Sequence, residues 1–172
     1  MRSLILVIHN VRSAHNVGSM LRSADGFGVA KVYFTGYSPY PSQINDERMP
    51  HIRDKVDYQI HKTALGAEDS VAWEYKKDIK STLNKLKKDG FLVVALEQTP
   101  AAITLGKFNS GQNITLVVGN EVDGLDQKTL ALCDVHVEIQ MRGQKESFNV
   151  AVAAAIAMYH FSTFKWLDKP EL

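Results

Sequence analysis

The sequence has 172 residues and a mass of 19.2 kDa, which is the size of about one domain. Hydrophobic residues make up 45% and charged residues 23%, and these ordinary proportions exclude collagen-like and disordered chains. The net charge is only +1, so any nucleic-acid site has to be a local patch. No apolar run approaches the roughly 18 residues of a membrane span, and the basic, apolar start is typical of a first strand, not of a signal peptide. With Cys133 as its single cysteine, the chain is expected to be cytoplasmic and to lack membrane contact.

Five short runs rich in Val, Ile, Leu and Phe predict strands. Most are continuously apolar, which is typical of strands that are covered on both faces of a parallel sheet. In chain order they are Leu4–His9, Lys31–Thr35, Phe91–Leu96, Ile114–Val118 and Val135–Ile139.

Helical patterns fall between these strands. Apolar residues at helical spacing follow Asn16, a candidate N-cap, and a second helix ends in lysines followed by Gly90, a typical C-terminus. The predicted helices cover about 16–24, 79–88, 127–132 and 147–164. Alternating strands and helices predict an α/β fold, with a mostly parallel sheet and helices on both faces. We find no repeat or linker, so residues 1–172 are expected to form a single domain.

The last predicted helix, from about Ser147 to Phe164, is apolar almost all round and rich in alanine. A helix without a polar face is buried on two sides. Because alanines let another helix approach closely, one side is a candidate subunit contact.

The segment from Gly36 to Lys62 fits neither pattern. It carries three prolines, three tyrosines and several basic residues, among them Arg48 and Arg53. Two interpretations stay open, a variable surface loop or a substrate-facing segment whose aromatic and basic residues suit bases and phosphates.

Three polar stretches follow predicted strands, at residues 16–24, 117–125 and 139–150, where open parallel sheets bind ligands. In the first, Arg22 lies about 140° around the helix from the apolar stripe, so it is either a solvated or a functional side chain. In the second, Gly119 and Gly124 allow a ligand to approach the backbone, or simply make a tight turn. In the third, Ser147 or Asn149 is a candidate N-cap. The six histidines show no ligand spacing, so no metal site is expected.

Taken together and in this order, the three stretches resemble the signature motifs of the SpoU/TrmH family of the SPOUT class of RNA methyltransferases. The resemblance covers nearly the whole chain. Its motifs are Asn16-x-Gly18-x-x-x-Arg22-x-Ala24, Val118-Gly119-Asn120-Glu121-x-x-Gly124-Leu125, and Ile139-x-Met141 followed by Ser147-Phe148-Asn149-Val150.

The resemblance implies transfer of a methyl group from S-adenosylmethionine to a ribose 2′-hydroxyl of RNA, either tRNA or rRNA. It also implies a SPOUT-type fold with a deep C-terminal trefoil knot, and a homodimer. The chain is expected to lack the separate RNA-binding extension that some relatives carry. The residues that match cofactor-binding positions are Leu96, Gly119, Ile139, Met141 and Phe148, and those that match catalytic positions are Asn16, Arg22, Glu121, Ser147 and Asn149. Gln140 stands where the motif often has proline.

The family's usual proposal makes the residue matching Arg22 the base. A guanidinium keeps its proton at any pH below about 12. Our hypothesis is therefore that Arg22 binds a phosphate and polarises the hydroxyl. His15 is a rival base. Asn16 and Glu121 are expected to orient Arg22 and the ribose, and Ser147 and Asn149 to fix the third motif's loop. The alternatives are a non-catalytic RNA-binding module of this fold, a methyltransferase acting on another substrate, and a nucleotide-dependent α/β enzyme.

Overall fold

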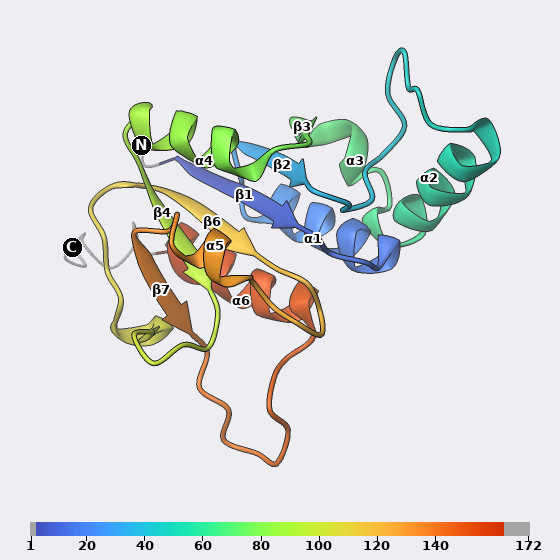
Figure 1. Cartoon of the computed structure of the whole chain (residues 1–172). Coiled ribbons are helices and arrows are strands. Elements are labelled where there is room, and N and C mark those ends of the chain that lie inside the picture. The colour runs from blue at the N-terminus through green and yellow to red at the C-terminus, as the bar shows by residue number, and fades with distance from the viewer. Residues whose placement is uncertain (1–2, 164–172) are drawn as a thin grey trace, which may run out of the picture.

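A seven-stranded parallel sheet forms the centre of the molecule (Figure 1). The computed structural model describes residues 3–163, and within them the strand order is β3-β2-β1-β6-β4-β7-β5, with every neighbouring pair parallel. The strands are β1 (Leu4–His9), β2 (Lys31–Thr35), β3 (Trp73–Lys76), β4 (Phe91–Leu96), β5 (Ile103–Thr104), β6 (Asn113–Val118) and β7 (Val135–Glu138).

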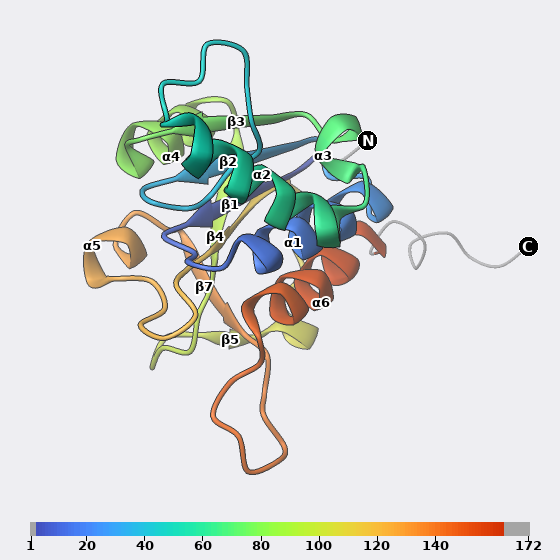
Figure 2. The same ribbon diagram turned by 90° about the vertical axis from the view of Figure 1, so that its right-hand side faces the viewer.

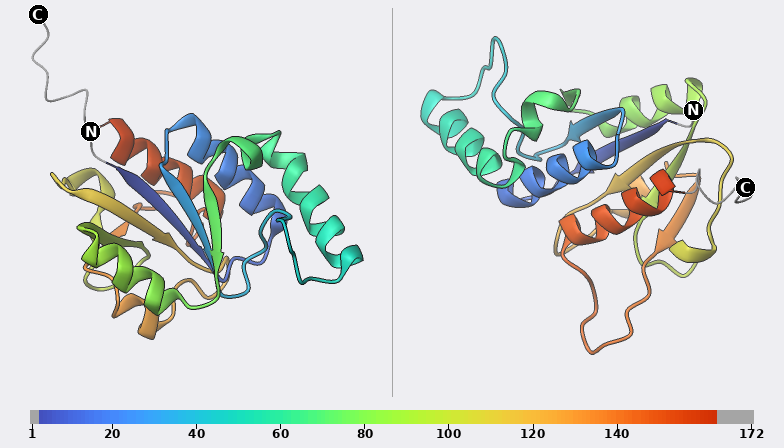
Figure 3. Two further views of the ribbon diagram at one scale, coloured as in Figure 1. Left: turned by 90° about the horizontal axis from the view of Figure 1, so that it is seen from above. Right: turned by 180° about the vertical axis from the view of Figure 1, so that it is seen from behind.

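Helices cover both faces of this sheet (Figures 2 and 3). Successive side chains of a strand point to opposite faces, so Leu6 and Ile8 join a hydrophobic cluster with α1 and α6, whereas Ile5 and Val7 join one with α4 and α5. The α/β prediction is thus confirmed, and the trefoil knot stays a prediction. The helices are α1 (Ala14–Gly26), α2 (Pro50–Ala64), α3 (Ala67–Ser70), α4 (Ile79–Lys88), α5 (Gln127–Leu130) and α6 (Val150–Thr163), with a short 3-10 helix at Leu105–Lys107.

The five strands predicted from apolar runs are confirmed, with two ends shifted by one residue. Strand β6 begins at Asn113, and β7 ends at Glu138. Strands β3 and β5 were not predicted. Strand β3 is an edge strand whose residues are half-buried or exposed, and β5 has only two residues. Neither strand therefore has the apolar run that marks a buried strand.

The prediction that residues 36–62 lack helix is wrong in its second half, because α2 runs from Pro50 to Ala64. Proline in the first turn and His61 and Lys62 in the last are helix signals that the sequence did contain. Its fully buried residues are only Ile60 and Ala64, so the apolar stripe is short. Tertiary contact with α1 therefore stabilises this helix more than its own pattern does.

Gly18 allows α1 and α2 to lie close together. A Cβ atom at this position would collide with the carbonyl oxygen of Ile60 and the hydroxyl of Thr63, both on α2. The glycine of the first motif therefore has a packing role. Backbone and side-chain atoms of α2 occupy the position that a side chain at Gly18 would take.

Helix α6 begins at Val150, three residues after the predicted start. The predicted last residue, Phe164, lies outside the described residues. Along the part of the chain that the structure describes, no helix is both long and apolar enough to cross a membrane. The predictions of a single domain and of a cytoplasmic location remain predictions.

Candidate functional site

A cavity of about 370 Å³ lies at the carboxyl ends of β4, β6 and β7. This is the edge at which parallel sheets bind ligands, and the volume suits a small molecule. Residues 118–124 form one part of its lining, and Glu146, Ser147, Phe148 and Val150 form another. The second and third motifs, which lie far apart in the sequence, thus meet around one space.

The charged side chains that line this cavity are all acidic. They include five carboxylates and neither lysine nor arginine. Clustered carboxylates favour a cationic ligand and disfavour phosphate groups. The five are Glu97, Glu121, Asp123, Glu138 and Glu146.

Glu121 connects the second motif to the first. Its Oε2 accepts a hydrogen bond from the backbone N–H of Arg12 at 2.9 Å, and its Oε1 accepts from the N–H of Ser13 at 3.0 Å and from Asn16 Nδ2 at 2.9 Å. Burial raises the pKa of this carboxyl, but the hydrogen bonds from Arg12, Asn16 and Ser13 outweigh burial and leave the pKa below its ordinary value. Glu121 is therefore an ionised acceptor at neutral pH.

Asn149 connects the third motif to the same network. Its Nδ2 donates to Asn16 Oδ1 at 3.1 Å, while its Oδ1 accepts from the N–H groups of Ala151 and Val152. The second pair of contacts is that of an N-cap, so Asn149, rather than Ser147, caps α6. One hydrogen-bonded chain thus joins Glu121, Asn16 and Asn149.

Asn120 has a hydrogen-bond partner for each of its amide groups. Its Nδ2 donates to the carbonyl of Asn10 and to the hydroxyl of Tyr37, at 3.1 and 2.8 Å. Its Oδ1 accepts from the N–H groups of Val122 and Asp123. This buried side chain holds the loop after β6 against the loops after β1 and β2.

The two glycines of the second motif serve the loop itself. A Cβ at Gly119 would lie 2.6 Å from the carbonyl carbon of Gly124, and one at Gly124 would collide with the carboxylate of Glu97. Gly124 also has a φ of 65°, which glycine adopts at little cost. Of the two roles left open by the sequence, the tight turn is the one that these contacts explain.

Four of the five predicted cofactor-binding residues line the cavity. They are Leu96, Gly119, Ile139 and Phe148. Met141 lies instead in an adjoining groove of about 450 Å³, together with Gln140. Ile139 lines both spaces, so the groove continues the cavity along the third motif.

The predicted catalytic residues fall into two groups. Glu121 and Ser147 line the cavity. Asn16 is hydrogen-bonded to Glu121, and Asn149 is hydrogen-bonded to Asn16, so these two are linked to the lining without belonging to it. Arg22 is exposed, does not line the cavity, and has no side-chain partner among the described residues. His15 is likewise exposed and outside the lining. Neither candidate base thus touches the cavity of its own chain.

Glu97 and Gln98 belong to the site, but the motifs did not single them out. Glu97 Oε2 accepts from the N–H of Leu125 at 2.8 Å, and Gln98 Nε2 donates to the carbonyl of Glu146 at 2.8 Å. They fasten the second and third motifs to the end of β4. Their position directly after a buried strand was the available signal.

Comparison with known proteins gives matches over most of the chain. The model of the SpoU rRNA Methylase family matches residues 3–159. A curated relative from Nitrosomonas europaea, the 23S rRNA (guanosine-2'-O-)-methyltransferase RlmB, is 32% identical over 163 residues, which are 95% of this chain and 56% of the relative. The chain thus spans little more than half the length of the curated relatives it matches.

Solved structures share the fold. The TrmH/SpoU tRNA modifying enzyme of A. aeolicus superimposes with a TM-score of 0.79 at 24% identity, covering 97% of this chain and 77% of that one. The SpoU methyltransferase AviRb from Streptomyces viridochromogenes, in complex with the cofactor AdoMet, gives a TM-score of 0.78 at 21% identity, covering 96% and 61%. At these identities the likeness shows a shared fold and nothing more.

Proposed function

The chain belongs to the SpoU rRNA Methylase family, and we propose that it transfers a methyl group from S-adenosylmethionine to a ribose 2′-hydroxyl of RNA, either tRNA or rRNA. The family match covers residues 3–159, and the curated relative named above is a ribose methyltransferase of 23S rRNA. Because this chain spans 56% of that relative, both the activity and the RNA are part of the proposal.

The charge of the cavity is the observation that carries the proposal. S-adenosylmethionine supplies an electrophilic methyl group on a positively charged sulfur atom. The five carboxylates of the lining attract such a cation, and no lysine or arginine of the lining offers a phosphate a partner. This argues against the alternative of a nucleotide-dependent enzyme, whose ligand would bring phosphates to the same space.

The residues of the lining also fit the uncharged part of the cofactor. Leu96, Ile139 and Phe148 provide apolar surface, Phe148 being 41% exposed, and Gly119 provides backbone. Met141 extends this surface along the adjoining groove. Apolar walls with a few charged groups are the usual composition of a small-molecule site.

Calorimetric titration with S-adenosylmethionine tests the cofactor, with ATP as the matched nucleotide control. We expect saturable binding at about one site per chain and no binding of ATP at the same concentrations. Binding of ATP without S-adenosylmethionine would overturn the proposal. Methyl transfer is then measured by mass spectrometry of nucleosides from unmodified tRNA and rRNA transcripts. RNA binding without cofactor binding would favour the non-catalytic module.

Arg22 is proposed to bind an RNA phosphate and polarise the hydroxyl. Its guanidinium stays charged at neutral pH, and no carboxylate among the described residues pairs with it. A free, exposed cation on α1 suits a phosphate. Glu121, Asn16 and Asn149 act as positioning residues, since their hydrogen bonds are to one another and to backbone. Ser147 lines the cavity and is proposed to position the third motif's loop.

A homodimer completes the proposal. Val152, Ile156 and Tyr159 repeat at helical spacing along α6, and they are 48%, 37% and 57% exposed, which makes an uncovered apolar stripe. Helix α1 lies beside α6 (Figure 2), so a second copy covering the stripe lies near Arg22. Such a copy could place Arg22 at the cavity of its partner. Light scattering of the wild type and of Ile156→Asp tests this proposal, and we expect the variant to be monomeric.

A further inference from the structure

A second cavity, of about 610 Å³, lies between the loop after β2, helix α2 and strand β3. Its lining includes Arg12, Tyr37, Tyr40, Ile52 and Tyr75. None of these residues belongs to the three motifs. Three tyrosines around one space are an aromatic surface without an assigned purpose.

The second cavity adjoins the first through two consecutive residues. Asn120 and Glu121 line the first cavity. Asn120 donates to the Tyr37 hydroxyl at 2.8 Å, and Glu121 accepts from the backbone N–H of Arg12 at 2.9 Å. Because Tyr37 and Arg12 line the second cavity, one loop holds part of the wall of both.

Tyr37 is held at both ends although 61% of its surface is exposed. Its hydroxyl contacts Asn120, and its backbone N–H donates to Asn10 Oδ1 at 3.2 Å. An aromatic ring that is already fixed loses little conformational entropy when it binds. Nucleobases stack on such rings regardless of sequence.

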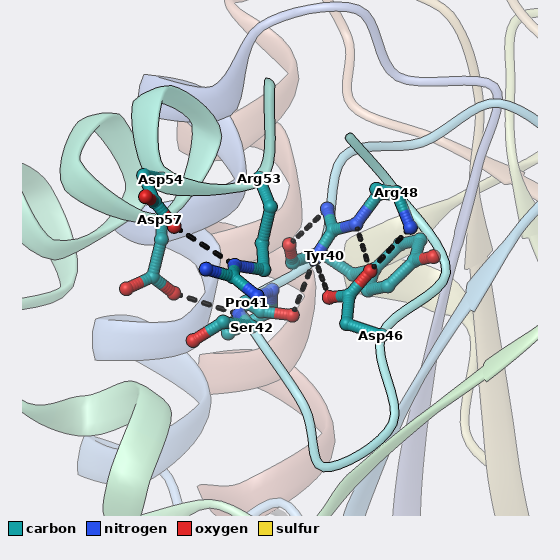
Figure 4. Close-up of polar contacts among 8 residues, drawn as sticks. All are labelled: Tyr40, Pro41, Ser42, Asp46, Arg48, Arg53, Asp54 and Asp57. Carbon is teal, nitrogen blue, oxygen red and sulfur yellow. Dashed lines mark hydrogen bonds and ion pairs between the residues drawn. The ribbon is translucent and has the colours of Figure 1, made fainter. Parts of the chain in front are cut away.

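Tyr40, another tyrosine of this lining, is held by its neighbours, and Figure 4 shows Arg48 beside it. The ring of Tyr40 stacks on Tyr75 at 4.3 Å, and the guanidinium of Arg48 lies 3.8 Å from the centre of the Tyr40 ring. Arg48 also donates to Asp46 and to the carbonyls of Tyr40 and Pro41. Arg48 therefore stabilises the loop and is not available to a phosphate.

Arg12 is the cation of this cavity that remains available. Its side chain is exposed and has no ion-pair or hydrogen-bond partner among the described residues. The carboxylates of the first cavity repel phosphates. On the side of the second cavity, Arg12 is therefore a cation that can bind a phosphate of an RNA strand passing the first cavity.

We propose that the second cavity binds the RNA nucleotide next to the one that is methylated, with its base stacked on Tyr37 and its phosphate on Arg12. This inference rests on the proposed function and extends it to a neighbouring nucleotide. It requires contacts that are tolerant of base identity, because neither a ring face nor a guanidinium on a phosphate reads sequence.

Affinity for unmodified tRNA and rRNA transcripts, measured at several salt concentrations, tests the inference. Tyr37→Ala should weaken RNA binding about tenfold through lost stacking, and Tyr37→Phe, which keeps the ring, should weaken it less. Tyr58→Ala is the matched control, since Tyr58 is also 61% exposed but lines neither cavity, and it should change affinity less than about twofold. Arg12→Gln should reduce the slope of log affinity against log salt by about 0.7, the value for one phosphate of a single strand.

The outcomes separate this inference from the proposed function. Asn120 keeps its other three side-chain hydrogen bonds in Tyr37→Ala. The affinity of this variant for S-adenosylmethionine should therefore stay within about twofold of wild type, which would show that the first cavity is intact. Equal effects of Tyr37→Ala and Tyr58→Ala, or of Tyr37→Phe and Tyr37→Ala, would overturn the subsite while leaving methyl transfer untouched. A wild type that binds RNA through Tyr37 but transfers no methyl group would overturn the proposed function alone. A wild type that binds no RNA would overturn both.

Discussion

Glu121 and Asn16 are joined by a hydrogen bond of 2.9 Å although they lie 105 positions apart in the chain. The bond connects the loop after β6 to the first turn of α1. Since Asn16 in turn accepts from Asn149, all three motifs depend on this pair.

Glu121→Gln should lower the free energy of unfolding by about 1–3 kcal/mol, because one oxygen that accepts hydrogen bonds becomes a donor facing N–H groups. Denaturant unfolding measures this. The pKa of Glu121 lies below its ordinary value in the folded chain, so its contribution is complete above the ordinary glutamate pKa of 4.5 and is lost as pH falls through the lower folded value. The difference between wild type and variant should therefore shrink below about pH 4.5. Asp123→Asn, in the same lining, is the control, and a difference that grows in acid would contradict the assignment.

Gly18→Ala should lower stability by about 1–3 kcal/mol, because the new methyl group has no room between α1 and α2. Gly26→Ala is the matched control on the same helix, since a Cβ there meets nothing within 4 Å. That control should be neutral or slightly stabilising. Thermal unfolding of the two variants compares them directly, and equal behaviour would refute the packing role of Gly18.

Asn149→Ala and Asn149→Asp separate two roles of one side chain. Alanine removes the cap of α6 and should cost about 1 kcal/mol of stability. Aspartate still caps the helix but cannot donate to Asn16 Oδ1, so stability should be largely kept while methyl transfer falls. Chemical denaturation and a methyl-transfer assay are needed together. If aspartate matched wild type in both, the contact with Asn16 would have no part in positioning the third motif.

Arg22→Ala should abolish methyl transfer while leaving S-adenosylmethionine affinity nearly intact, because Arg22 does not line the cofactor cavity. Arg53→Ala is the control and should retain activity, since Arg53 is an arginine of α2 that pairs with Asp54 and lies outside the cofactor cavity. Titration calorimetry and nucleoside mass spectrometry give the two readouts. An equal loss of cofactor affinity and turnover would argue that Arg22 supports the cavity itself.

His15→Ala tests the rival base. If His15 withdrew the proton, the variant would lose activity. Because His15 is exposed and lies outside the cavity of its own chain, we expect the variant to keep the pH profile of the wild type. A loss of methyl transfer with cofactor affinity retained would assign the base to His15 instead.

Local pattern predicted the elements that are buried on both faces. Strands β1, β2 and β4 have the predicted ends, because a continuous apolar run has few alternatives in a chain of this composition. Helix α2 was missed because its buried stripe is short and its neighbour, α1, supplies the contact that stabilises it. Tertiary packing of this kind leaves only a weak trace in sequence.

The sequence by itself determined the α/β class, the order of the motifs and their position at the ends of strands, since these follow from hydrophobic periodicity and residue spacing along the chain. Only the tertiary structure decided that Glu121, Asn16 and Asn149 form one hydrogen-bonded chain, that Arg22 lies outside the cavity, and that Arg48 is a structural cation while Arg12 is available. The physical reason is that these properties depend on which groups satisfy one another across the fold. Such partners are set by three-dimensional packing and by the need to pair buried polar atoms.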